Sequence, residues 1–370
     1  IDQNCRNWHI KVCPLFARIR SADLANFRFS MVTIDAMRAV IAEKYGGPEV
    51  LQIADVPVPR VGPTGVLVRV HAASVNPVDW KLREGWLSAL WKLRFPVIWG
   101  CDASGVVEEV GPAVTMFKAG DEVYGFKHGK VGKTYRGTYA EYAVLPENTL
   151  AHKPATLTHQ QAAAVPLAAV TAWQALVGQG RIKPGSKVLI QAGAGGVGIF
   201  AVQIAKAFGA YVAATAGTRN QDLLRKLGAD LAVDYTRERV EEKLLGYDLV
   251  LDCVGESLWP SSLSVLRFGG RLVTLAVPIP HGPSGKFKFF WTAMAGIFSG
   301  TARATLQGKR LLITQAKPRG GDLEKLNALI EAGKLRPVVE KIFSLECIAE
   351  AQLESKTGHV RGKLVVNIFG

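Results

Sequence analysis

Cysteine is sparse and scattered in this chain of 370 residues, which contains five cysteines and no Cys-x-x-Cys pair. A structural zinc lobe needs closely spaced cysteines, so the composition argues against one. The scattering also differs from the framework of a secreted, disulfide-rich protein and favours a reducing compartment. We therefore expect a cytoplasmic protein, with an organelle or a membrane surface as the alternative locations.

The chain also lacks a basic run interleaved with aromatic residues, although its formal net charge is +14. Nucleic-acid binding requires a localised footprint of this kind, so we predict no nucleic-acid partner. A secretory hydrophobic region is absent as well. What the chain does have is 48% hydrophobic residues, enough to bury the cores of two domains.

Residues 1–36 differ from the rest, because they are rich in arginine and poor in acids and begin with Ile1. Two interpretations fit this composition: a transit-like segment, or sequence that lies upstream of a start at Met31 or Met37. We favour the second, because residues 37–40 open a strand-like run.

A glycine-rich turn is the most informative motif that is present. An apolar strand at 188–191 leads into Gly193, Gly195 and Gly198, and a helix with an apolar face follows from near Val197. In a dinucleotide site these three glycines allow a tight turn, approach of the backbone to the pyrophosphate, and close packing of helix on strand. The flanking pattern predicts a βαβ unit with Gly196 and Val197 inside the turn; the alternative is a glycine-rich surface loop.

No acidic residue follows the second strand of this unit, at 211–215. NAD sites usually place Asp or Glu there to accept hydrogen bonds from the ribose, whereas this chain has Thr218 and Arg219. A guanidinium suits a 2′-phosphate through its planar donors, so the sequence predicts NADP(H) as the cofactor. The alternative is that Arg219 caps a solvated loop.

The pattern of elements changes along the chain. Short apolar runs separated by Pro and Gly predict an all-β module from 37 to 150, and alternating strands and helices after 160 predict a doubly wound parallel sheet. We expect the last strands, at 341–345 and 363–368, to rejoin the first domain. The predicted fold class is therefore α/β, with a β domain at 37–160 and 317–370 and a Rossmann domain at 161–316.

Five motifs together resemble the zinc-free medium-chain dehydrogenase/reductase superfamily, in its quinone oxidoreductase and enone reductase branch. They are YGGPEVL (45–51), ASVNPVDWKLREG (73–85), GCDASGVV (100–107), GDEVYG (120–125) and GTYAEY (137–142). The resemblance implies a GroES-like β domain, a Rossmann domain, an active site between them and a homodimer. Zinc-binding relatives carry a catalytic Cys and a His-Glu pair, which this chain lacks at the matching positions, so we predict no metal.

By the same resemblance, Asn76 and Lys81 lie near the nicotinamide and the substrate, and Asp79 orients the Lys81 ammonium. A lysine ammonium can polarise a carbonyl or hold the cofactor ribose; the alternative for Asn76 and Asp79 is hydrogen bonding to nearby backbone. Tyr45, Tyr124 and Tyr139 are further candidate donors, although tyrosines beside glycines are more often packing residues. The resemblance also assigns cofactor contacts to Thr171, Tyr235, Cys253, Val254, Leu275, Ala276, Arg361 and Lys363.

The segment 286–310 is long, aromatic and flanked by basic residues. It predicts either a buried flap or subunit contact, which we favour, or a peripheral contact with a membrane. The overall prediction is an NADPH-dependent, zinc-independent reductase of quinones or α,β-unsaturated carbonyls. The alternative is an NADPH-binding protein of low turnover that associates with a membrane surface or nucleic acid.

Overall fold

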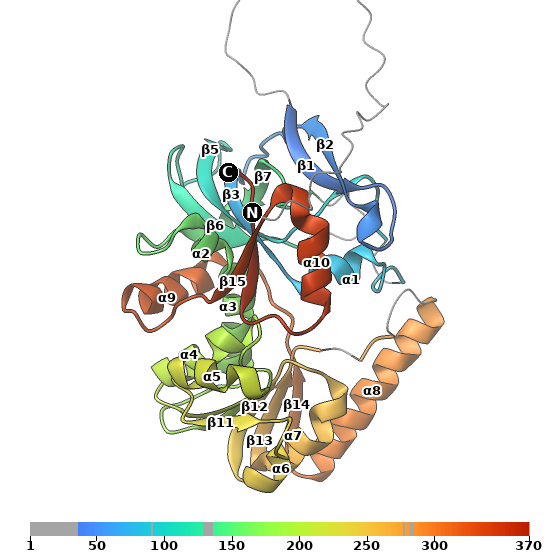
Figure 1. Ribbon diagram of the computed structural model, residues 1–370, viewed down its shortest axis with the longest axis vertical. Helices are drawn as coiled ribbons and strands as arrows, with labels where there is room; N and C mark the ends of the chain where they lie inside the picture. The colour runs from blue at the N-terminus through green and yellow to red at the C-terminus, as the bar shows by residue number, and fades with distance from the viewer. Residues whose placement is uncertain (1–35, 90–91, 129–135, 277, 281–284, 370) are drawn as a thin grey trace, which may run out of the picture.

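The computed structural model describes residues 36–89, 92–128, 136–276, 278–280 and 285–369. The predicted extension, residues 1–36, lies outside this part except for its last residue. Figure 1 shows two sheets in separate halves of the molecule, with helices around the lower one. The predicted fold class, a β domain combined with a doubly wound parallel sheet, is confirmed.

The upper half contains a seven-stranded sheet in which strands from both ends of the chain meet. Its order is β15-β16-β3-β5-β6-β8, with β7 also paired to β3. The last strand of the chain, β16, runs antiparallel to β3, so that Leu364 lies opposite Val75. The strands are β3 (Gly65–Val75), β5 (Asp102–Val110), β6 (Glu122–Phe126), β7 (Tyr142–Pro146), β8 (Leu150–His152), β15 (Val339–Ser344) and β16 (Lys363–Asn367).

A smaller sheet lies beside it, with the order β2-β1-β4. It consists of β1 (Ala36–Ala42), β2 (Gln52–Pro57) and β4 (Val97–Ile98). The short helix α1 (Pro77–Arg83) follows β3, and α10 (Ile348–Lys356) packs beside it. Pro77 at the first position of α1 fits a helix start, because its missing N–H would have no partner there.

The lower half is a six-stranded parallel sheet with the order β11-β10-β9-β12-β13-β14. The order reverses beside β9, the strand that precedes the glycine turn, and ligands of such sheets bind at this reversal. Its strands are β9 (Lys187–Ile190), β10 (Tyr211–Ala216), β11 (Leu231–Asp234), β12 (Tyr247–Asp252), β13 (Leu266–Thr274) and β14 (Arg310–Ile313).

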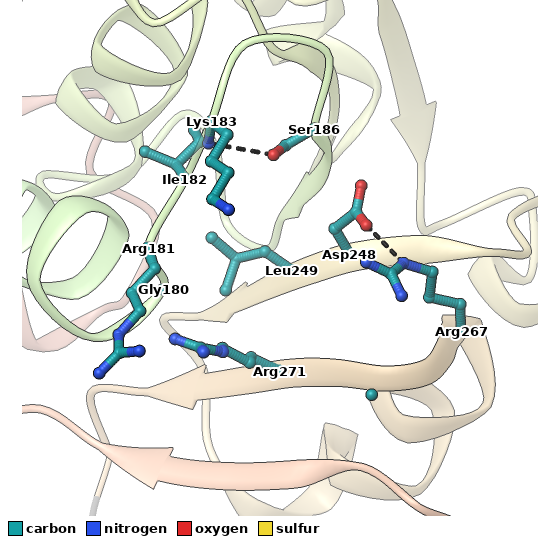
Figure 2. Close-up of a pocket in the computed structure, with 10 residues that line it drawn as sticks. Gly180, Arg181, Ile182, Lys183, Ser186, Asp248, Leu249, Arg267 and Arg271 are labelled. Atoms are coloured by element: carbon teal, nitrogen blue, oxygen red, sulfur yellow. Dashed lines mark hydrogen bonds and ion pairs between the residues drawn. The ribbon is translucent and has the colours of Figure 1, made fainter.

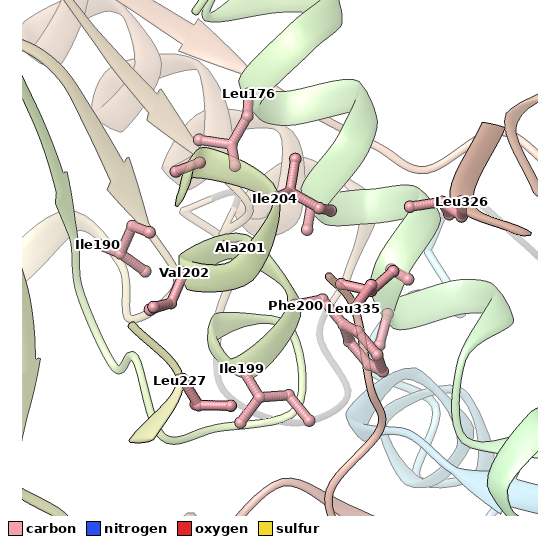
Figure 3. Close-up of a cluster of buried hydrophobic side chains, with 14 of the residues drawn as sticks. Leu176, Ile190, Ile199, Phe200, Ala201, Val202, Ile204, Leu227, Leu326 and Leu335 are labelled. Atoms are coloured by element: carbon pink, nitrogen blue, oxygen red, sulfur yellow. The ribbon is translucent and has the colours of Figure 1, made fainter. Parts of the chain in front are cut away.

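Helices cover both faces of this sheet. Figure 3 shows α4 (Gly198–Ala207) with Phe200 and Ile204 in a buried cluster that also contains Leu326 of α9 (Gly320–Glu331). The α4 sequence is almost entirely apolar because it is buried between the sheet and the neighbouring helices. The remaining helices are α2 (His159–Ala163), α3 (Pro166–Trp173), α5 (Gln221–Lys226), α6 (Val240–Lys243), α7 (Trp259–Val265) and α8 (Lys286–Leu306).

One predicted helix is divided. The sequence predicts a single helix over 161–177, whereas the structure has α2, then α3, then a wider π-type turn at Gln174–Gln179. Pro166 lacks a backbone N–H and cannot continue α2, so it begins α3 instead. This break places the N-terminus of α3 against the β domain, which proves important for the candidate site.

Candidate active site

The glycine turn follows β9 at the carboxyl edge of the parallel sheet. The Gly193 N–H donates to the Thr215 carbonyl of β10 (2.8 Å), which fixes the turn against the neighbouring strand. A Cβ atom on Gly198 would lie 2.2 Å from the Ala192 carbonyl oxygen, so only glycine fits there. Helix α4 begins at Gly198, with Val197 as its N-cap, and the aligned peptide dipoles of the helix place partial positive charge at this end. These features fit a pyrophosphate.

The C-terminal segment crosses this turn. The Gly362 N–H donates to the Ala194 carbonyl (2.8 Å), and a Cβ atom on Gly196 would lie 3.2 Å from the Lys363 side chain. A Cβ atom on Gly195 would lie 3.3 Å from the Ala192 carbonyl oxygen, so a side chain would be tightly placed there as well. The buried Nε of Arg361 has no hydrogen-bond partner, so a donor remains available beside the turn.

An acidic side chain that the sequence analysis did not identify lies next to the residues that follow β10. The hydroxyl of Thr218 donates to Asp234 Oδ2 (2.5 Å), and Asp234 comes from the end of β11, the next strand. Hydrogen bonds from Thr218 and Thr236 lower the pKa of Asp234, so it is a carboxylate at neutral pH. Arg219 is exposed and donates to the backbone carbonyl of His359. The edge thus contains both a guanidinium and a carboxylate.

The loop after β12 is fixed by Asp252. Its Oδ1 accepts from the backbone N–H groups of Val254 (2.8 Å) and Gly255 (3.0 Å), and its Oδ2 accepts from the Thr274 hydroxyl (2.8 Å). Burial raises the pKa of Asp252, while these donors act in the opposite direction. The carboxylate therefore joins the ends of β12 and β13, where the predicted cofactor contacts Cys253, Val254, Leu275 and Ala276 lie.

Two other predicted cofactor contacts differ in exposure. Tyr235 follows β11 and is 57% exposed, and its hydroxyl would lie 3.7 Å from a Cβ atom on Gly217. Thr171 is buried within α3, and its hydroxyl donates to the Leu167 carbonyl of the same helix (2.6 Å). Tyr235 is therefore accessible to a ligand at this edge, whereas the Thr171 hydroxyl is already bonded to its own helix.

A buried polar cluster lies on the β-domain side, centred on Asp102. One carboxylate oxygen accepts from the Ser74 hydroxyl (2.5 Å) and from Asn76 Nδ2 (2.8 Å). The other accepts from the Leu167 N–H (2.8 Å) in the first turn of α3. Asp102 is fully buried, so these donors and the positive end of the helix replace its hydration.

Lys363 joins this cluster to the glycine turn. Its ammonium donates to Asn76 Oδ1 (2.5 Å) and to the Val75 carbonyl (3.1 Å), and it is buried. Burial lowers the pKa of Lys363, whereas the carboxylates of Asp102 and Asp79 raise it. The Asn76 amide therefore bridges a cation and an anion, and this arrangement fixes which way its nitrogen and oxygen point.

Asp79, in the first turn of α1, accepts three hydrogen bonds. They come from the Asn76 N–H (2.8 Å), the Tyr139 hydroxyl (2.9 Å) and the Cys101 thiol (3.3 Å). Burial nevertheless raises the pKa of Asp79 to about 6. The bond to Asn76 is the local backbone contact expected under the alternative interpretation, and the bonds to Tyr139 and Cys101 extend beyond it.

The structure separates Lys81 from Asn76 and Asp79. The Lys81 ammonium lies 5.4 Å from the ring centroids of both Trp80 and Trp86, on another side of α1. Burial lowers its pKa. Sequence reasoning therefore grouped Lys81 with a cluster to which it does not bond, and it missed Ser74 and Asp102, which do belong to that cluster.

The donor set does not fit a zinc ion. Cys101 bonds to Asp79, and among the residues that the structure describes no three His, Cys, Asp or Glu side chains are grouped to hold a metal. For the chain as a whole, the absence of a metal site remains a prediction, because the structure describes only part of the chain. Likewise, none of the helices in the described ranges is long and apolar enough to cross a membrane.

Helix α8 is exposed along much of its length. Phe287 (82% exposed), Trp291 (67%) and Phe298 (75%) are exposed to solvent. The ring centroids of Phe287 and Trp291 lie 6.3 Å apart, with an angle of 7° between the ring planes. Only Phe289, Gly300 and Ala304 are buried. The expectation of a buried flap is therefore wrong for α8, whereas a subunit contact and a membrane contact both stay predictions.

Comparisons with known proteins agree with this geometry. The family described as alcohol dehydrogenase GroES-like domain matches residues 62–155, and the family described as zinc-binding dehydrogenase matches residues 227–366. The mitochondrial NAD(P)H oxidoreductase RTN4IP1 of Danio rerio is 35% identical over 99% of this chain and 98% of the relative. The chloroplastic NADPH-dependent alkenal/one oxidoreductase of Arabidopsis thaliana is 38% identical over 96% of this chain and 87% of its own.

A solved structure supports the same assignment. The quinone oxidoreductase from Coxiella burnetii is 34% identical, covers 90% of this chain and 100% of its own, and superposes with a TM-score of 0.79. The similarity extends over both domains, so it includes the glycine turn and the buried cluster. The chain therefore belongs to the medium-chain dehydrogenase/reductase superfamily, in its quinone oxidoreductase and enone reductase branch.

Proposed function

We propose that this chain is an NADPH-dependent reductase of quinones or α,β-unsaturated carbonyl compounds that works without zinc. One observation carries the proposal: residues 361–363 join the glycine turn to the buried cluster, through Gly362 on one side and Lys363 on the other. A nucleotide at the turn would thus lie beside a fixed amide and a buried cation. The names of the relatives, which include alkenal/one and quinone oxidoreductases, support the substrate class.

The residues at the carboxyl edge are suited to hold the cofactor. We assign the pyrophosphate to the glycine turn and the start of α4, with Arg361 as an additional donor, because its Nε is otherwise unpaired. Thr218, Arg219 and Tyr235 would surround the adenosine end. A reduced nicotinamide supplies the hydride in this chemistry.

The buried cluster would stabilise the charge that the reaction creates. Reduction of a conjugated carbonyl places negative charge on its oxygen, and pre-arranged donors lower the energy of that state. We assign Asn76 to the wall of the substrate site, Lys363 and Asp102 to positioning its amide, and Asp79 to fixing the start of α1. Lys81 remains a candidate for the ribose or the substrate carbonyl, acting from its place between Trp80 and Trp86.

The preference for NADPH over NADH rests on Arg219, which is exposed at the end of β10 and is suited to a 2′-phosphate. Asp234 opposes it, because its carboxylate lies at Thr218 and would repel the same phosphate. We propose that Arg219 dominates, since Asp234 already accepts hydrogen bonds from Thr218 and Thr236.

The exposed face of α8 supports a peripheral contact with an anionic membrane. The helix has no acidic residue, three basic residues (Lys286, Lys288 and Arg303) and an aromatic surface, and these properties favour binding at a lipid interface. A homodimer, which the family resemblance implies, could use the same face. Relatives named as mitochondrial or chloroplastic support an organelle among the predicted locations.

Activity assays with a substrate panel test the proposal. NADPH oxidation is followed with quinones, alkenals and enones, before and after treatment with a chelator. We expect turnover with at least one conjugated acceptor and no effect of chelation. Activity that chelation removes and zinc restores would contradict the zinc-free mechanism, and absence of turnover with the whole panel would contradict the substrate class.

A further inference from the structure

A second charged site lies at the amino edge of the six-stranded sheet, where a pocket of about 260 Å³ opens beside the starts of β12 and β13. The nucleotide edge is at the other end of the same strands. Because β9 has four residues and a strand rises about 3.3 Å per residue, the two edges are separated by roughly 13 Å or more. This pocket is therefore distinct from the predicted cofactor site.

Four cationic side chains and a single carboxylate line the pocket. Figure 2 shows the guanidinium groups of Arg181 and Arg271 directed to the same side of it, with Lys183 and Arg267 farther along the wall. The carboxylate belongs to Asp248. With these groups ionised, the lining carries a net charge of about +3 at neutral pH.

The acid in the pocket is already bonded on both oxygens. Asp248 Oδ1 accepts from Arg267 Nε (2.5 Å), and Oδ2 accepts from the Lys187 N–H (2.7 Å). Arg271 donates one bond to the Gln179 carbonyl (2.7 Å). In the described part of the chain, the side chains of Arg181 and Lys183 have no hydrogen bond or ion pair. Two cations therefore remain without an acceptor.

One of these cations belongs to a residue with an uncommon backbone conformation. Arg181 has a φ of 52°, a conformation that residues other than glycine rarely adopt and that costs free energy. Figure 2 shows its guanidinium on the same side of the pocket as that of Arg271. Burial, and then the charges of Arg181 and Arg310, lower the pKa of Arg271. Like charges are thus brought together at a concave site, and an anion bound between them would relieve this repulsion.

We propose that this pocket binds a small anion bearing a phosphate or diphosphate group. Planar guanidinium donors match phosphate oxygens, and two arginines with a lysine provide several charge-assisted hydrogen bonds. The volume is below the range typical of drug-sized ligands, so the organic part of the ligand is small. Ile182 and Leu249 provide an apolar wall for that part. The inference is independent of the proposed reductase activity.

Calorimetric titration with pyrophosphate tests the inference. The full chain is saturated with NADPH, which blocks the nucleotide edge, and ionic strength is held constant with chloride because salt screens these charges. We expect pyrophosphate to bind one site. The double variant Arg181→Asn/Lys183→Gln should raise its Kd by roughly tenfold or more. Asparagine is chosen because it tolerates the left-handed backbone of residue 181.

The matched control is Arg60→Asn/Lys118→Gln, which removes the same two charges from exposed positions of the β domain. We expect this variant to bind pyrophosphate as the parent does. Absence of binding to the parent chain at millimolar pyrophosphate would overturn the inference. An equal loss of affinity in the control would do the same, because it would show a general effect of net charge.

Discussion

Asp102 and Arg219 lie on opposite sides of the candidate active site, and they differ in how their charges are matched. Asp102 is fully buried and accepts three hydrogen bonds, whereas Arg219 is exposed and donates to a single backbone carbonyl. A buried charge that has all its hydrogen-bond partners fixes the positions of the groups around it. Loss of any one partner costs free energy. An exposed charge with spare donors remains available to a ligand. We therefore expect the β-domain side to position groups and the sheet edge to recognise the cofactor.

The largest effect is expected from Asn76→Ala, which tests the buried side of this comparison. The change removes the amide between Lys363 and Asp102 and leaves both with fewer partners. We expect kcat/KM for an enone or quinone to fall on the order of a hundredfold, similar to the loss of one pre-arranged donor in other enzymes. Steady-state kinetics measure it.

Asn327→Ala is the control for this change. Asn327 also bridges two partners, the Tyr124 hydroxyl and the His152 carbonyl, but it lies on α9 outside the cluster. We expect its kcat/KM to stay within about threefold of the parent, because no group near the reaction changes. If both variants lose activity equally, the cluster has no special place in catalysis.

The second effect concerns Asp79, whose pKa is raised to about 6 from a reference of 3.8. Between these values the folded chain binds this proton and the unfolded chain does not. Stability therefore decreases as pH rises through this window, by up to about 3 kcal/mol in total. Asp79→Asn should remove that component, so that the stability difference between variant and parent changes between pH 4 and pH 6 and is constant above pH 7. Urea unfolding at a series of pH values measures it, and a constant difference throughout would contradict the raised pKa.

The third predicted effect concerns Arg219, the exposed charge in this comparison. Arg219→Ala should raise the Kd of NADPH by about tenfold while leaving that of NADH nearly unchanged, because the proposed partner of the guanidinium, the 2′-phosphate, is absent from NADH. Fluorescence titration with both coenzymes measures the ratio. The control is Arg225→Ala on α5, whose guanidinium pairs with Asp222 on the surface.

Asp234→Asn is a second test of the same coenzyme preference. The change removes the opposing carboxylate and should lower the Kd of NADPH relative to the Kd of NADH. We expect a change of roughly threefold, because a neighbouring charge at an exposed site is partly screened. If Arg219→Ala weakens both coenzymes equally, Arg219 does not select the phosphate and the NADPH preference has no support at this edge.

The smallest effect is expected at α8, the other exposed region. The triple variant Phe287→Ser/Trp291→Ser/Phe298→Ser should sediment with anionic vesicles roughly two- to fivefold less than the parent, because it loses the apolar contact while keeping the charge. The control replaces Leu245, Ile342 and Leu353, which are also exposed, with serine. If the parent does not bind vesicles and the triple variant changes a dimer into a monomer, α8 is a subunit contact and the membrane proposal is wrong.

The sequence predicted local features of the site well and contacts between distant segments poorly. The glycine turn could be predicted because its strand, turn and helix are contiguous in the sequence. The helix was expected from near Val197, and α4 begins at Gly198. Asp102 was quoted only as part of a motif, because its partner Leu167 lies 65 residues away, and only folding brings the start of α3 to it.

The contact between Lys363 and Asn76 spans 287 residues and depends on β16 pairing with β3. The bond from Asp234 to Thr218 likewise depends on which strand lies next to β10. Lys81 is only five residues from Asn76 in the sequence, yet its ammonium lies beside Trp80 and Trp86 and makes no bond to Asn76, so its predicted role stays a prediction. Which strands pair, and which side of a helix faces the site, depend on the tertiary structure. The residues of a motif alone therefore do not predict these contacts.

The place of Lys363 also bears on how the protein is made. The ammonium that bonds to Asn76 belongs to the final strand, so a nascent chain still being translated has the first domain's amide without its cation. The strands of the first domain that precede it can pair early, but this strand is added only after residues 363–367 have been translated. A chain that ends shortly before residue 363 would contain all six strands of the parallel sheet and lack the cation beside Asn76.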